Sequence, residues 1–186
     1  MYVTVHRSGG RQGLYKARVE QVADAAGQLV TDHMGSRMPN VRIILTDHAG
    51  MTRLKERADR EVAGGEEGSG ARPSLSLCDG LAVALQSSAL GQTVLDRRGI
   101  LMLINGWRQK NLRDLDETLV HELVHCVQLN VPETHARQIA FIRQLYNVTP
   151  RTSEFGAYMK VVDDQEKEAY DLERLARKLP PPADDE

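Results

Sequence analysis

The 186-residue sequence predicts an α+β fold with a small mixed β-sheet, an N-terminal helix, a central helix and C-terminal helices. Apolar residues recur at helical spacing in several long segments, which supports the helices. Short runs rich in Val, Ile and Leu stand beside glycine-containing turns, which supports the strands. The length suits one domain with a real core, and we expect residues 1–179 to form that domain.

The first half of the chain predicts two strands, a helix and a loop. The strands are expected at 3–5 and 41–46, and the helix from residue 13 to about residue 34. The stretch 59–74 contains four glycines and Pro73, a composition typical of a flexible loop.

The second half predicts more strands and then helices. Strands are expected at 75–78 and 81–85, followed by a hairpin of strands 92–95 and 99–104. The segment 111–130 has the apolar spacing of a helix.

Three further features concern where the helices begin and end. Asp114 and Glu117 have the spacing of a capping box for the 111–130 helix, and Pro132 follows its end. Helices are expected near 134–146, with Thr134 as N-cap, and near 163–179. The proline-rich end, residues 180–186, predicts a frayed tail.

The most informative chemical pattern lies inside the 111–130 helix, where residues 121–125 read His-Glu-Leu-Val-His. Positions four apart share one face of a helix, so His121 and His125 can bind one metal ion. Glu122 can reach a water on that metal and act as a general base. Two imidazoles, a carboxylate and an open water position form a known catalytic zinc site, so Zn²⁺ is the expected metal.

The third metal ligand is expected downstream of this motif. The segment Glu166-Lys-Glu168-Ala169 resembles the second motif of the gluzincins, the thermolysin-like peptidases, in which a small residue follows the ligand glutamate by three positions. Positions i and i+3 share a helix face, so a small residue there lets two helices approach. This resemblance favours Glu166, because Glu168 would point about 160° away around the helix axis.

A histidine is the alternative third ligand. His135 opens the 134–146 segment and resembles the third-ligand histidine of SprT-like proteases, although Ala136 stands where those proteins usually have glycine. The longer metzincin motif is excluded, because its third histidine would fall on Val131.

Over residues 117–175 the chain is similar to small bacterial and phage HExxH proteins with a His-Glu-Leu-x-His-x-x-Gln helix and a later Glu-x-Glu-Ala segment. One departure concerns the group that supports a histidine ligand. Gluzincins usually have aspartate four residues after the ligand glutamate, where this chain has Tyr170, and Asp171 follows one residue later. The supporting group therefore stays open at this point.

The resemblance implies a minimal zincin fold and a zinc metallopeptidase, an endopeptidase acting on peptides or proteins. An edge strand between residues 75 and 104 would bind the substrate backbone. The oxyanion donor stays open among four residues: Tyr146, Tyr158, Tyr170 and His135. Two alternatives are a non-catalytic zincin-fold binding protein and an SprT-like protease that uses His135.

Composition limits the partners and the cellular location that we expect for the protein. The net charge is −2 and the arginines are scattered, so no nucleic-acid partner is expected. No apolar run has the length of a membrane span and no signal pattern opens the chain, so we expect a cytoplasmic protein, with signal-independent export as the alternative. The cysteines, Cys78 and Cys126, have no metal-ligand spacing, and Cys126 is expected to be a buried thiol.

Overall fold

A computed structural model describes residues 1–6, 11–64, 89–150 and 154–182 of the chain. Its four strands form one mixed sheet in the order β1-β2-β4-β3. The strands are β1 (Tyr2–Val5), β2 (Val41–Thr46), β3 (Gly91–Asp96) and β4 (Gly99–Asn105). The first two and β4 are parallel, whereas β3 pairs antiparallel with β4 in a hairpin. Within the described residues, β3 is thus an edge strand.

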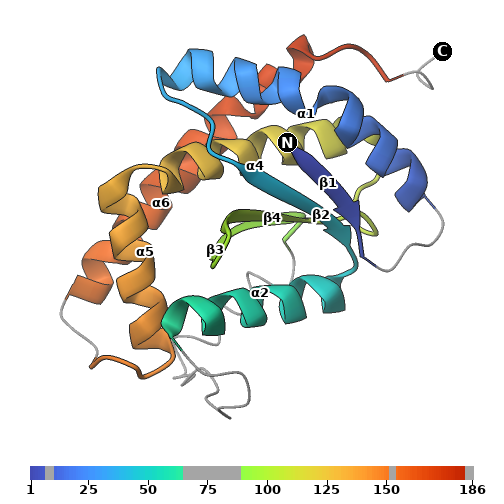
Figure 1. The fold of residues 1–186 in the computed structure, drawn as a ribbon. Helices are drawn as coiled ribbons and strands as arrows, with labels where there is room; N and C mark the ends of the chain where they lie inside the picture. The colour runs from blue at the N-terminus through green and yellow to red at the C-terminus, as the bar shows by residue number, and fades with distance from the viewer. Residues whose placement is uncertain (7–10, 65–88, 151–153, 183–186) are drawn as a thin grey trace.

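Helices cover both faces of this sheet (Figure 1). On one face lie α1 (Gln12–Met34) and α4 (Leu112–Leu129), and on the other lies α2 (His48–Ala63). The predicted α+β class with a small mixed sheet is confirmed.

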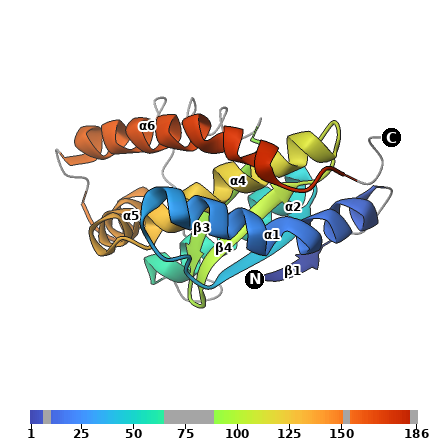
Figure 2. The ribbon, with the colours of Figure 1, turned by 90° about the horizontal axis from the view of Figure 1, so that it is seen from above.

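The C-terminal helices build outward from α4. They are α5 (Pro132–Leu145), α6 (Glu154–Leu172) and a 3₁₀ helix, η1 (Glu173–Lys178). Viewed from above, α4 lies between α1 and α6 (Figure 2). Because α4 contacts the sheet and the helices on both of its sides, it is the central support of the molecule.

The core explains why β4 reads as a nearly continuous apolar run. Its alternate residues Ile100, Met102 and Ile104 pack with α1 and α4, whereas Leu101 and Leu103 pack toward α2. The same alternation places Leu95 of β3 on the α4 side of the sheet. Residues of β3 two and four positions before Leu95 therefore also face α4.

Several expected elements appear close to their predicted bounds. The strand at 41–46 is confirmed, as are the helix ending at Met34 and the hairpin between β3 and β4. The hairpin turns at Arg97–Arg98, and Gly99 has a φ of +119°, a conformation that favours glycine. The strands expected at 75–78 and 81–85 lie outside the described residues.

The loop expected at 59–74 begins too early, because residues 59–63 belong to α2. Asp47 caps this helix by accepting a hydrogen bond from the Gly50 N–H at 2.6 Å. Gly64 ends it with a φ of +83°. The remainder of the predicted loop, from residue 65, lies outside the described residues.

Two predicted helix starts are also wrong. The side chain of Asn111 caps α4 by accepting from the Asp114 N–H at 2.8 Å, in place of a capping box at Asp114 and Glu117. Helix α5 begins at Pro132, whose ring suits the first helical position, and not after Thr134.

Corrections at the C-terminus concern α6 and the tail. The last helix starts at Glu154, nine residues before the expected position, and turns into η1 at Glu173. The predicted tail is docked over residues 180–182: the Pro180 carbonyl accepts a hydrogen bond from Arg18 at 2.5 Å, and Pro182 is buried. No helix in the described ranges has the length and apolar character needed to cross a membrane.

Candidate metal centre

Helix α4 is a fixed platform for the HExxH residues. It is buried along most of its length, with the side chains of Leu119, Leu123 and Val124 fully enclosed. A site built on such a helix keeps its geometry, because packing on several sides restricts both backbone and rotamers.

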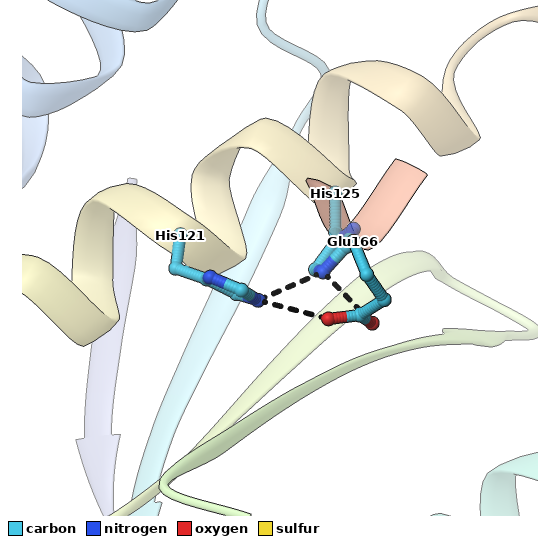
Figure 3. A group of neighbouring side chains, drawn as sticks. All are labelled: His121, His125 and Glu166. Atoms are coloured by element: carbon cyan, nitrogen blue, oxygen red, sulfur yellow. Dashed lines mark hydrogen bonds and ion pairs between the residues drawn. The ribbon is translucent and has the colours of Figure 1, made fainter. Parts of the chain in front are cut away.

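The two histidines of the motif lie one turn apart and point to the same place (Figure 3). Their Nε2 atoms are 3.1 Å apart, and the ring centroids are 4.8 Å apart at an interplanar angle of 75°. The side chains are 12% and 15% exposed, so both rings are largely shielded while their Nε2 atoms remain directed toward a common point.

Glu166 reaches this point from α6 (Figure 3). Its two carboxylate oxygens lie 3.4 Å from the Nε2 atoms of His121 and His125, respectively. One ligand atom from each of the three residues lies within 4.8 Å of the others, an arrangement able to hold a metal ion. Ala169 is fully buried in the core cluster that contains α4, as expected for the small residue three positions later.

The other two candidate ligands lie elsewhere. Glu168 is exposed and accepts a hydrogen bond from the Gln128 amide at 2.9 Å. His135 is on α5, and it is not part of the His121–His125–Glu166 cluster. The structure therefore brings together the set that contains Glu166.

Each imidazole has an oxygen at its far nitrogen. The Nδ1 of His121 lies 2.9 Å from Glu173 Oε1, and the Nδ1 of His125 lies 2.7 Å from Gln128 Oε1. The Gln128 amide nitrogen in turn donates to the Gln165 carbonyl at 3.1 Å, which identifies its oxygen as the acceptor for His125.

These contacts determine which nitrogen is free. An oxygen acceptor at Nδ1 keeps the proton there, so a neutral imidazole presents the lone pair of Nε2 to the shared point. Support of this kind is what metal-binding histidines usually have. Glu173 was missed from the sequence; its distance of seven residues from Glu166, two helical turns, was the available signal.

Glu122 lies beside the two histidines and is 4% exposed. Burial raises the pKa of its carboxyl, although the neighbouring histidines and a hydrogen bond from Thr93 oppose this rise. The Thr93 hydroxyl donates to Glu122 Oε2 at 2.7 Å. Cys126 is a buried thiol, as expected, and burial raises its pKa.

The charges of the cluster hold protons on the histidines. Burial by itself lowers the pKa of His125, but the Glu166 hydrogen bond and the Glu122 charge outweigh it and raise that pKa to about 9. The pKa of His121 is raised for the same reasons. Hydrogen bonds from both histidines lower the pKa of Glu166. Two imidazoles facing a carboxylate thus favour a positive charge at this point.

The three tyrosines among the four oxyanion candidates differ in where they lie. Tyr146 is buried, with its hydroxyl 3.5 Å from the Glu56 carbonyl, and the Tyr158 hydroxyl bonds to Gln138. Tyr170 stands edge-on to His121 with ring centroids 4.8 Å apart, and it is 62% exposed. Tyr170 is the tyrosine at the cluster.

Comparisons of the chain with protein-family models, curated proteins and solved structures find no match.

Proposed function

We propose that the protein is a zinc-dependent metallopeptidase. The observation that carries this proposal is the convergence of His121, His125 and Glu166 on one point, with Glu122 buried beside it. Two neutral imidazoles and one carboxylate are a donor set that suits Zn²⁺ and leaves a position for water or substrate. A structural zinc site would instead have four protein ligands.

The residues of the chain would divide the work as follows. His121, His125 and Glu166 would hold the metal, which would supply Lewis-acid chemistry to the substrate carbonyl and to water. Glu122 would accept a proton from the attacking water and deliver it to the leaving amine. The raised pKa of the Glu122 carboxyl suits this exchange, because a general base works best when its pKa lies near the pH at which it operates.

The edge strand β3 supports a peptide as the substrate. The Asp96–Gly99 pair flanks the two-residue turn, so residues 92, 94 and 96 bond to β4. The main-chain groups of Gly91 and Thr93 consequently point away from β4. Within the described residues no strand pairs with this edge. An extended peptide added there would lie next to Glu122, which contacts Thr93.

Tyr170 is suited to the developing oxyanion. Its ring contacts His121 and its exposure leaves it open to a substrate carbonyl. Tyr146 and Tyr158 are less suited, because their hydroxyls lie against Glu56 and Gln138.

Zinc content and hydrolysis together test the proposal. The purified protein should hold about one zinc per chain, and His121→Ala should lose it. Glu122→Gln should retain zinc and lose about 10²–10⁴-fold in peptide hydrolysis. His33→Ala, which changes an exposed histidine of α1, is the matched control and should change neither measurement.

Two results would contradict the proposal in different ways. A folded protein that binds no zinc would remove the metal centre. A wild-type protein that binds zinc and hydrolyses no peptide would favour a non-catalytic zincin-fold protein.

A further inference from the structure

Glu122 is held by the edge strand as well as by its own helix. The Thr93 hydroxyl donates to Glu122 Oε2 at 2.7 Å and lies 3.1 Å from the Glu122 main-chain oxygen. Among the described residues, Thr93 is the one hydrogen-bond donor to this carboxylate. A carboxylate that is 4% exposed depends on such a donor for its orientation, because little water reaches it.

Gly91 provides the space for the same carboxylate. A Cβ at Gly91 would lie 2.6 Å from both Cγ and Oε1 of Glu122, closer than such atoms approach. Gly91 has no positive φ, so its backbone does not require glycine. Close approach of the carboxylate is therefore the reason that glycine fits at this position.

Both contacts come from one face of β3. Gly91 and Thr93 alternate with Gln92, and they share the α4 side of the sheet with Leu95. The Thr93 hydroxyl donates to Oε2 of Glu122, and no side chain of the described residues donates to Oε1. One carboxylate oxygen is thus fixed by β3, and the other lies against Gly91.

We infer that Thr93 is a positioning residue for the general base, with Gly91 leaving the clearance that the base requires. This inference rests on the proposed function, since it concerns how Glu122 is oriented toward the water. It goes beyond that function, because the strand proposed to bind the substrate backbone would also set the direction of the base. Substrate pairing and base orientation would then depend on the same two residues of β3.

Kinetics of Thr93 variants provide the first test. Thr93→Val keeps the shape and removes the hydroxyl, and it should lower kcat about 10- to 100-fold, as expected for a lost bond to a charged group. KM and zinc content should not change, and Thr93→Ser should restore most of kcat. Thr4→Val, the same change in the opposite edge strand β1, is the control. Unchanged kcat in Thr93→Val would overturn the inference.

Gly91→Ala tests the clearance. The added methyl group should displace Glu122 and lower kcat at least as much as Thr93→Val, with zinc retained. Gly13→Ala is the matched control, since a Cβ at Gly13 meets no atom within 4 Å. A Gly91→Ala variant with full kcat would contradict the close approach.

A double-mutant cycle on the metal-free protein needs no activity. Thr93→Val and Glu122→Leu are made singly and together, and their unfolding is measured in urea. If the two side chains interact, the single effects should fail to combine, with a coupling of about tenfold in the unfolding equilibrium constant. Independent effects would show that the contact does not hold.

The kinetic measurements and the double-mutant cycle together separate this inference from the proposed function. An inactive wild-type protein that shows the coupling would contradict the peptidase, and the positioning role with it, but would leave the contact standing. An active wild-type protein whose Thr93→Val variant keeps its kcat would contradict the inference alone.

Discussion

Helix α4 carries two charged clusters that differ in how complete they are. Near its start, Asp116 pairs with Arg18 of α1 through two bonds of 3.0 and 2.6 Å, and both side chains are at most 5% exposed. The same guanidinium also bonds to Gln21 and to the Pro180 carbonyl. Both charges are thus paired within the protein, as a buried ion pair requires.

The His121–His125–Glu166 cluster, two turns further along α4, is arranged differently. Its histidine Nε2 atoms face each other at 3.1 Å, although neither can donate a hydrogen bond to the other when both rings are neutral and carry their protons on Nδ1. Their Nδ1 atoms are directed outward to Glu173 and Gln128. This arrangement requires a positive charge from outside the side chains, either protons or a metal ion. The comparison separates a cluster that completes the fold from one prepared for a ligand.

The largest expected effect is a loss of stability when the Arg18–Asp116 pair is broken. Arg18→Met leaves Asp116 buried without a partner, and it should lower the free energy of unfolding by about 3–5 kcal/mol. The double variant Arg18→Met with Asp116→Leu should recover much of this loss, because no lone charge remains buried. Urea unfolding of the metal-free protein measures both.

The same experiment tests whether the two clusters are independent of each other. Zinc affinity should be unchanged in the folded double variant, because the two clusters share no side chain. A double variant as unstable as Arg18→Met, or one that loses zinc, would show that the clusters are not independent.

The next effect concerns the exposed side of the His121–His125–Glu166 cluster. Tyr170→Phe keeps the ring against His121 and removes the hydroxyl, and it should lower kcat about 10²–10³-fold if the hydroxyl stabilises the oxyanion. KM and zinc content should remain close to those of the wild type. Tyr2→Phe changes a tyrosine of similar exposure on β1 and is the control. Full activity in Tyr170→Phe would remove Tyr170 from the mechanism.

Outward support of the histidines is expected to matter somewhat less. Glu173→Gln removes the negative charge behind His121, and it should weaken zinc binding about 10- to 100-fold. Asp171→Asn, a change in an exposed acid two residues earlier, should have little effect. Competition with a chelator measures both affinities. Equal effects of the two substitutions would indicate that only the general negative charge of this helix contributes.

How far the sequence predicts the molecule depends on whether a feature is local. The β2 strand, the β3–β4 hairpin and α4 have apolar patterns and turn residues that belong to the elements themselves. The helix α2 was missed because its surface is largely charged. Ion pairs four residues apart, such as Arg57–Glu61 and Lys55–Asp59, lie along it. Met51, Leu54 and Ala58 nevertheless recur at helical spacing and pack in one core cluster, which was the available signal.

The site divides in the same way. His121, Glu122 and His125 form a local motif, and Glu166 could be chosen because Glu166–Ala169 resembles the second motif of the gluzincins. Thr93 and Gly91 could not be found, because their relation to Glu122 depends on the strand order and on which face of β3 meets α4. Glu173 follows the end of α6, so its approach to His121 depends on how α6 and η1 pack on α4.

The smallest predicted effect is a pair of opposite pH trends, one in the stability of the metal-free protein and one in its affinity for zinc. The pKa of His125 in the folded metal-free protein is raised to about 9 from an ordinary value of 6.5. The charged form therefore stabilises the fold fully below pH 6.5, and this contribution is lost as the pH rises through about 9. Metal binding has the opposite dependence, because a histidine must lose its proton before its Nε2 can bind zinc.

Between pH 7 and pH 8, zinc affinity should therefore rise about tenfold for each proton released, while the metal-free protein becomes less stable. Chelator competition and urea unfolding measure the two trends. His125→Asn should flatten the pH dependence of stability in this range. The Arg18–Asp116 pair is the internal control, because it remains intact in this variant. Affinity and stability that both stay constant in this range would mean that the histidines are already neutral in the metal-free protein, and the contrast between the Arg18–Asp116 pair and the His121–His125–Glu166 cluster would then be wrong.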